Sequence, residues 1–257
     1  MTGYIRIPLD LWQRLQAEAI PEAEPAAPLP PVVAPAEATD ASWAFADYGK
    51  FYDWLRNNDM LGPKISADEF KGCDTIIRAC AKAGWPVSWT AYALATAYHE
   101  TAHTMLPIHE LGGDAYLKRM YDITGNRPAK AKELGNLSPG DGVKYAGRGY
   151  PQTTGKNNYA KATAKLRAMG IDVDLVANPD RMMEPEIAAA TMISGMQEGW
   201  FTGRKVSDDL PAKGPGSKAQ FDPTRDTING TDKAAQIADY AVDFQSALLA
   251  GGYKIAA

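Results

Sequence analysis

Cysteine is scarce in this chain of 257 residues, whose two cysteines, Cys73 and Cys80, lie seven positions apart. Both fall in a segment that we predict to be helical, where two turns would separate their Cα atoms by roughly 10 Å. That separation is too long for a disulfide within one continuous helix. We therefore expect two reduced, largely buried thiols and assembly in a reducing compartment.

Long hydrophobic runs are also missing. No stretch is apolar enough to cross a bilayer. The first twenty residues lack the basic-then-apolar layout of a signal peptide, because Asp10, Gln13, Arg14 and Gln16 interrupt the apolar positions. An excess of basic residues is absent too, since the net charge is -4, and this gives no sign of a nucleic-acid partner. We expect no stable membrane insertion. If the protein acts outside a cell, another factor must release it.

The composition predicts three parts. Residues 1–20 form an N-terminal segment, and its apolar positions around Trp12 predict a short helix. This helix would serve either as a docked terminal helix or as a partner-binding segment. Residues 21–42 are rich in proline and alanine, which favours an extended linker without a packed core. Residues 43–257 carry apolar side chains at helical spacing and form the folded domain.

Within this domain the pattern predicts a mainly α-helical fold with at most a small β-hairpin. Ser66 and Glu69 have the spacing of a capping box. A buried helix is expected to start near Ser88 and to run through Glu100 until Pro107 ends it. The segment 111–145 is rich in turn residues and is predicted to form loops.

All three histidines lie between Tyr98 and Glu110. His99, Glu100 and His103 fit the HExxH spacing of a zinc peptidase, and His109 stands where the extended pattern places a third ligand. However, Leu106 stands where that extended pattern has a glycine, and leucine is unfavourable at positive φ. A zinc peptidase stays open as an alternative to the carboxylate chemistry considered next.

Glu100 and Glu110 can also be a pair of carboxylates that cleave a glycosidic bond. Glu100 follows a buried helix, and burial raises the pKa of a carboxyl so that it can hold a proton near neutrality. The segment 144–159 adds glycines together with Arg, Gln, Thr, Asn and Tyr. So many neutral donors and acceptors suit sugar hydroxyls and amides.

Four motifs in order resemble glycoside hydrolase family 19, which contains chitinases and related bacteriophage endolysins. They are His99-Glu100-Thr101, Gly147-Arg148-Gly149-x-x-Gln152-x-Thr154, Asn158-Tyr159 and Ile228-Asn229-Gly230. The tract Leu137–Tyr145 resembles the phage and prophage branch in particular. The resemblance covers about residues 45–250.

The resemblance implies a lysozyme-like helical domain with a deep substrate cleft, and hydrolysis with inversion. Glu100 would be the general acid and Glu110 the general base, with their carboxyls about 6.5–9.5 Å apart, while Thr154 would help hold the attacking water. No cofactor or metal is implied. Substrate-binding roles would fall to His99, Tyr145, Arg148, Gln152, Asn158, Tyr159 and Asn229.

We therefore expect a monomeric endolysin that hydrolyses the β-1,4 bonds of peptidoglycan glycan strands. The resemblance implies that it stays in the cytoplasm of the host bacterium until a holin-type step releases it to the cell wall. Chitin is the second substrate candidate, because both polymers contain N-acetylglucosamine. A third possibility, besides the zinc peptidase, is a non-catalytic module that binds the cell wall or belongs to a virion.

Overall fold

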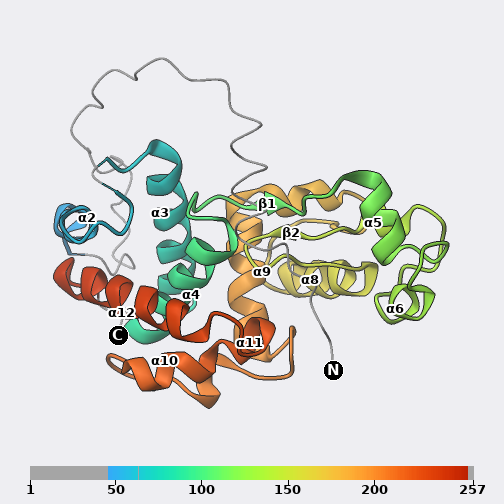
Figure 1. Ribbon diagram of the computed structural model, residues 1–257. Helices are drawn as coiled ribbons and strands as arrows, with labels where there is room; N and C mark the ends of the chain where they lie inside the picture. Colours follow the sequence, from blue (N-terminus) through green and yellow to red (C-terminus); the bar gives the residue numbers. More distant parts are fainter. Residues whose placement is uncertain (1–45, 63, 254–257) are drawn as a thin grey trace.

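The computed structural model describes residues 46–62 and 64–253, so the predicted N-terminal segment and linker lie outside the described residues. The described chain is mainly helical, as expected, with one two-stranded sheet (Figure 1). Its α-helices are α2 (Tyr48–Asn57), α3 (Ala67–Lys82), α4 (Val87–Glu100), α5 (Gly113–Tyr121), α6 (Pro128–Glu133), α7 (Asp141–Lys144), α8 (Lys156–Ala168), α9 (Pro185–Glu198), α10 (Lys218–Thr224), α11 (Asp226–Asn229) and α12 (Ala234–Ala250). Two 3-10 helices are η1 (Pro179–Met183) and η2 (Val206–Asp208), and the strands are β1 (Ile108–His109) and β2 (Arg148–Gly149).

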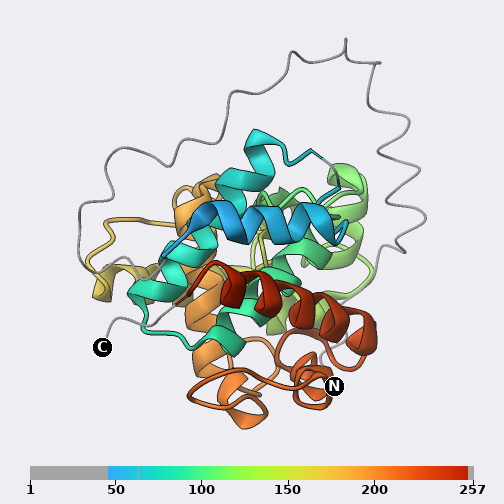
Figure 2. The ribbon, with the colours of Figure 1, turned by 90° about the vertical axis from the view of Figure 1, so that its left-hand side faces the viewer.

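The largest core surrounds α4. Nearly every side chain of this helix from Val87 to Tyr98 is buried. Alanine at alternate positions from Ala91 to Ala97 leaves room for neighbouring helices to approach closely. Helices α3 and α12 pack on α4, and α12 also lies beside α2 (Figure 2). The core thereby fixes the direction of α4 and the position of Glu100 at its end.

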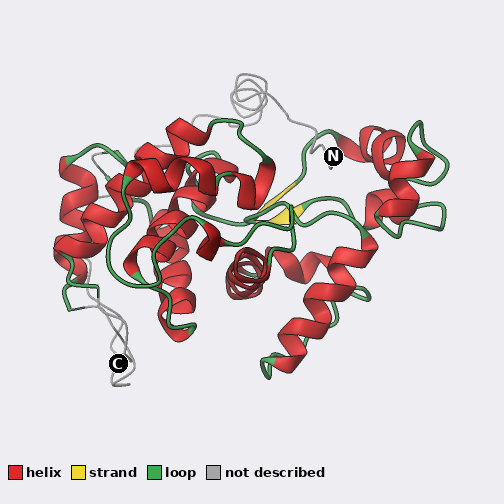
Figure 3. Ribbon diagram, turned by 90° about the horizontal axis from the view of Figure 1, so that it is seen from below, coloured by secondary structure: helices red, strands yellow, loops and turns green. Residues whose placement is uncertain are grey.

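A second group of helices, α5, α6, α7 and α8, lies on the other side of α9 (Figure 1). It contains two smaller apolar clusters, one around Tyr145, Tyr159 and Leu166 and one around Leu117 and Tyr121. The sheet lies between the two groups of helices (Figure 3). The helix that ends at Glu100 and the helices that follow Glu110 thus belong to different cores.

The sheet differs from the small hairpin allowed by the sequence pattern. β1 and β2 pair antiparallel, with Ile108 opposite Gly149 and His109 opposite Arg148, although three helices separate the strands in the chain. The pairing is therefore a long-range contact rather than a hairpin. It brings the segment after α4 against the glycine-rich segment that precedes α8.

The capping box at α3 is confirmed, because the Ser66 hydroxyl accepts a hydrogen bond from the backbone of Glu69 and the Glu69 carboxylate accepts one from the backbone of Ser66. The prediction of loops over 111–145 was wrong, since this segment contains α5, α6 and α7. Short polar helices of this kind carry little hydrophobic periodicity and are held by tertiary contacts. Asp122 supplies such contacts, because its buried carboxylate accepts hydrogen bonds from the backbone of Thr124, Gly140 and Gly142.

Among residues 46–62 and 64–253, none of the helices combines the length and the hydropathy that a bilayer-spanning helix requires.

Candidate active site

The helix α4 ends at Glu100, seven residues before the proline that was expected to end it. The reason is the buried Thr101, whose hydroxyl donates to the carbonyl of Ala97 at 2.7 Å and accepts from the amide of Met105 at 3.0 Å. These bonds turn the chain away from the helix axis. Glu100 is therefore presented in the last helical position, with its side chain 19% exposed.

The turn after Glu100 is strained. Ala102, His103 and Met105 have φ angles of 45°, 75° and 58°, in the left-handed region that costs free energy for residues other than glycine. Met105 is fully buried, and its carbonyl lies so close to Gly72 of α3 that any side chain there would collide with it. Packing against α3 thus maintains a turn that local propensity disfavours.

The geometry required for the zinc peptidase is not formed. His103 lies beyond the end of α4 with positive φ, so it does not share a helix face with His99. Its ring stacks on Tyr98 instead, with centroids 4.0 Å apart and planes 8° apart. His109 faces its neighbour, with Nδ1 2.9 Å from the Glu110 carbonyl oxygen. Within the described residues, no three His, Cys, Asp or Glu side chains cluster in a way that could hold a metal ion.

Glu100 has an ion-pair partner that the sequence pattern did not indicate. Nη1 of Arg225 donates to Oε1 of Glu100 at 2.7 Å, and Nε of the same guanidinium donates to the carbonyl of Asp232 at 2.9 Å. Arg225 is only 2% exposed. A buried guanidinium that donates two hydrogen bonds in this way fixes one carboxylate oxygen and supplies a permanent positive charge beside it.

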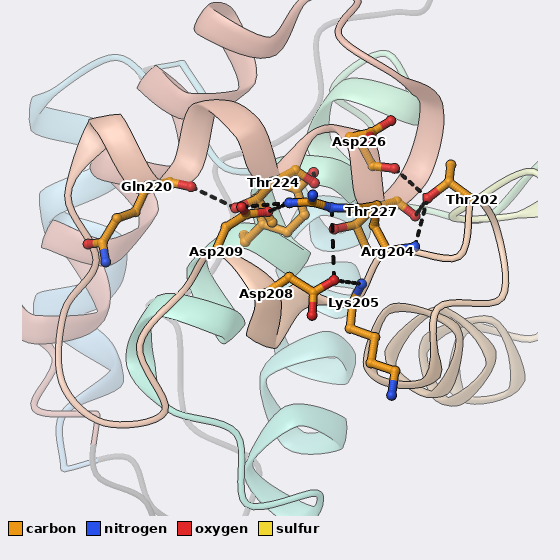
Figure 4. Close-up of polar contacts among 10 residues, drawn as sticks. Thr202, Arg204, Lys205, Asp208, Asp209, Gln220, Thr224, Asp226 and Thr227 are labelled. Atoms are coloured by element: carbon orange, nitrogen blue, oxygen red, sulfur yellow. Dashed lines mark hydrogen bonds and ion pairs between the residues drawn. The ribbon is translucent and has the colours of Figure 1, made fainter.

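The segment that carries Arg225 is itself tied down. The buried Tyr92 of α4 donates to the carbonyl of Thr224 at 2.8 Å, which joins the Glu100 helix directly to the residue before Arg225. On the other side, the Thr202 hydroxyl donates to the carbonyls of Asp226 and Thr227 (Figure 4). Arg225 is thus held from both sides before it contacts Glu100.

Glu110 is held by neutral donors. Its Oε1 accepts from the Tyr121 hydroxyl at 2.7 Å, and its Oε2 accepts from the backbone amide of Gly147 at 3.1 Å. The backbone amide of Glu110 donates to the Gly147 carbonyl at 2.7 Å. Burial raises the pKa of the Glu110 carboxyl, although the hydrogen bonds from the Tyr121 hydroxyl and the Gly147 amide and the nearby His109 act to lower it.

Three polar side chains converge on the space beside Gly147. A Cβ atom at this glycine would lie 2.9 Å from Oε2 of Glu110, 2.9 Å from Oε1 of Gln152 and 3.1 Å from Oγ1 of Thr154. The Thr154 hydroxyl donates its hydrogen to the Gln152 carbonyl at 2.9 Å, which leaves its lone pairs free to accept. All three oxygens can accept a hydrogen bond, so the cluster suits a ligand that carries hydroxyl or amide hydrogens.

Gln152 also fixes the sheet beneath this cluster. Its Nε2 donates to the carbonyls of Ile108 and Gly149, one on each strand, at 3.0 and 3.1 Å. To make both bonds Gln152 adopts a φ of 52°, in the left-handed region. Since such a conformation costs free energy, the side-chain contacts must maintain it.

Three residues with predicted substrate-binding roles are buried behind the Gly147 cluster. Arg148 is 5% exposed and donates to Asp180, to two backbone carbonyls and to the hydroxyl of Tyr159, so it contacts neither candidate glutamate. Tyr159 is fully buried, and Tyr145 donates to the carbonyl of Val176. The structure therefore places these side chains behind the surface, where they support it.

The remaining predicted positions are half-buried. Asn158 donates to the Thr154 carbonyl at 2.7 Å and so lies directly behind the Gly147 cluster. His99 precedes Glu100 in the last turn of α4, and burial lowers the pKa of its imidazole, so its neutral form is favoured. Asn229 ends α11, four residues after Arg225. The separation of the two carboxyls and the expected deep cleft stay predictions.

Two residues of the site, Arg225 and Tyr121, were missed by sequence reasoning. Arg225 directly precedes the Asp226–Asn229 stretch, and Tyr121 lies eleven positions after Glu110 in a segment predicted to be loop. The adjacent motif was the only local signal for Arg225. For Tyr121, recognising α5 would have placed an aromatic side chain within reach of Glu110.

Comparison with known proteins shows a likeness in fold. No protein-family model matches the sequence, and no curated protein matches it. Chitinase C from Streptomyces griseus superimposes with a TM-score of 0.52 at 20% identity, covering 81% of this chain and 78% of that chain. A bacterial family 19 chitinase gives a TM-score of 0.43 at 17% identity, covering 82% of this chain and 97% of that chain. The first of these shares the helical fold described above.

Proposed function

We propose that this protein is a glycoside hydrolase that cleaves β-1,4 bonds of a glycan containing N-acetylglucosamine, with inversion. The observation that carries the proposal is the cluster beside Gly147, where a half-buried carboxylate, an amide oxygen and a hydroxyl lie close together against the same glycine. This arrangement is suited to a water molecule that a carboxylate activates. The fold shared with a Streptomyces chitinase agrees with this chemistry.

In the proposed reaction Glu100 donates its proton to the glycosidic oxygen as the bond from that oxygen to the anomeric carbon breaks. Glu110 takes a proton from a water whose oxygen attacks the opposite face of the same carbon. Arg225 then faces the carboxylate that Glu100 becomes, and the opposite charges at 2.7 Å stabilise it. The raised pKa of Glu110 makes its carboxylate a stronger base.

Peptidoglycan is the proposed substrate, and the protein is proposed to act as an endolysin because of the tract Leu137–Tyr145 and its resemblance to the phage branch. Chitin is the second candidate, favoured by the Streptomyces chitinase that shares the fold. Incubation with purified peptidoglycan and with chitin oligomers, followed by reducing-end assay and mass spectrometry, tests both. We expect new reducing ends on the glycan and intact peptides. Cut peptides, or binding without any new reducing end, would contradict the proposal.

The phenol of Tyr121 gives a test of the base. Its hydrogen bond to Glu110 lowers the pKa of that carboxyl, so Tyr121→Phe is expected to raise this pKa further. Because the base must be deprotonated, the acidic limb of the kcat/KM profile should move to higher pH. The control is Tyr52→Phe, which loses a hydrogen bond to the Phe70 carbonyl between α2 and α3 and should leave the profile unchanged. An acidic limb that stays in place in Tyr121→Phe would argue against Glu110 as the base.

A further inference from the structure

The charge of the molecule is unevenly distributed. Residues 113–170, which include α5 to α8, carry eleven Lys and Arg against four Asp and Glu, a net charge of +7 in a chain whose total is -4. These helices form the group that supports Glu110 (Figure 1). A local excess of this size favours an anionic partner and repels a cationic one.

About half of these cationic side chains form ion pairs within the protein. In the described part of the chain, Lys130, Lys156, Arg148, Lys165 and Arg167 each have a carboxylate partner within 4.0 Å. No ion pair involves the other six among the described residues, and these are Lys118, Arg119, Arg127, Lys132, Lys144 and Lys161. The unpaired cations are therefore available to a ligand.

Two of the six lie next to the candidate active site. Arg119 places its guanidinium carbon 5.6 Å from the centre of the Tyr116 ring. Burial raises the pKa of Tyr116, and the charges around it act in opposite senses, with Glu110 raising it and both Arg119 and Arg127 lowering it. Arg127 acts in the same way on Tyr121, the tyrosine that binds Glu110. The backbone amide of Asn126, the residue before Arg127, donates to the Arg119 carbonyl at 2.9 Å, so the two arginines lie on neighbouring segments.

The Tyr116 ring, on which Arg119 lies, is held in place by its packing. A Cβ atom at Gly112 would lie 2.5 Å from the ring, so the ring packs directly on the backbone before α5, where Gly112 has a φ of 123°. The other contacts of the ring are with the apolar cluster of Leu117 and Tyr121. Arg119 therefore rests on a rigid aromatic support, and less conformational entropy is lost when its guanidinium binds a ligand.

From this arrangement we infer that Arg119 and Arg127 form an anion-binding subsite beside Glu110, which binds a carboxylate carried by the glycan substrate. The inference rests on the proposed function and narrows its substrate to a glycan with acidic substituents, such as the lactyl and peptide carboxylates of peptidoglycan. The planar guanidinium suits a carboxylate because two N–H groups can bind its two oxygens. Chitin is uncharged and gains nothing from these arginines.

The test compares two substrates that differ only in charge, namely native peptidoglycan and the same material with its carboxyls converted to amides. For the double variant Arg119→Gln/Arg127→Gln we expect KM on native peptidoglycan to rise about threefold to tenfold, because exposed ion pairs are individually weak. The kcat should stay within about twofold, because neither arginine donates to the candidate glutamates. KM on the amidated polymer and on chitin oligomers should not change.

The matched control is Lys132→Gln/Lys161→Gln, which removes the same charge from α6 and α8, with Lys161 lying over the ring of Trp200. An equal rise of KM in this control, or a rise on the amidated polymer as large as on the native one, would overturn the inference. Should the unaltered protein cut no glycan at all, the proposed function fails. Co-sedimentation of the same variants with native and amidated sacculi then tests the anion-binding subsite separately. A loss of binding to native sacculi alone in Arg119→Gln/Arg127→Gln supports the subsite. Binding equal to that of the unaltered protein overturns it.

Discussion

Glu100→Gln is expected to lower kcat for glycan hydrolysis by about 10³-fold, within the range for loss of a general acid. The amide cannot supply the proton that the leaving oxygen needs. It keeps an oxygen that can accept the hydrogen bond from Arg225, so the fold should persist. The measurement is kcat on purified glycan, with far-UV circular dichroism to confirm the helical content.

The control for this variant is a glutamate that also has an arginine partner but lies elsewhere. Glu184 is paired with Arg181 on the surface, and Glu184→Gln should keep full activity. Full activity in Glu100→Gln as well would show that another group supplies the proton. The contrast tests the position of Glu100, since both variants lose one ion-paired carboxylate.

Much of the fold could be predicted because its signals are local. The capping box of Ser66 and Glu69 depends on a three-residue spacing, and the burial of α4 follows from its run of apolar and small residues. The end of α4 was placed too late because Pro107 is a visible helix breaker, whereas the true end depends on Thr101 and on packing against Gly72. The latter is a tertiary contact, which a single segment does not reveal.

In the candidate site, too, the residues with local sequence signals were predicted and those set by tertiary contacts were not. The sequence motifs pointed to Glu110, Gln152 and Thr154, and the structure brings these three together around Gly147. Arg148 was expected to bind substrate, whereas the structure bonds it to Asp180 and Tyr159. The arginine that does contact a glutamate, Arg225, lies 125 positions from Glu100. A pairing over that distance is set by how α12 packs against both α4 and α10, which no local pattern encodes.

Replacing this arginine should have the largest effect on stability. In Arg225→Met the apolar side chain fills a similar volume but leaves the Glu100 carboxylate without its partner and the Asp232 carbonyl without its donor. Breaking a buried pair by removing one partner costs about 3–5 kcal/mol. We expect urea unfolding to show a loss of that order and kcat to fall about 10²-fold or more, as for loss of a donor to a developing charge.

Two further variants separate the loss of charge from the loss of packing. Arg225→Lys keeps the charge but cannot bond Glu100 and the Asp232 carbonyl together, so we expect kcat to be restored in part. In the double variant Glu100→Gln/Arg225→Met no carboxylate remains unpaired. The stability cost of Arg225→Met should therefore be smaller in that background than in the unaltered protein, by about 1–3 kcal/mol of coupling. An equal cost in both backgrounds would mean that Arg225 acts through the Asp232 carbonyl and the surrounding packing, and that its charge does not support Glu100.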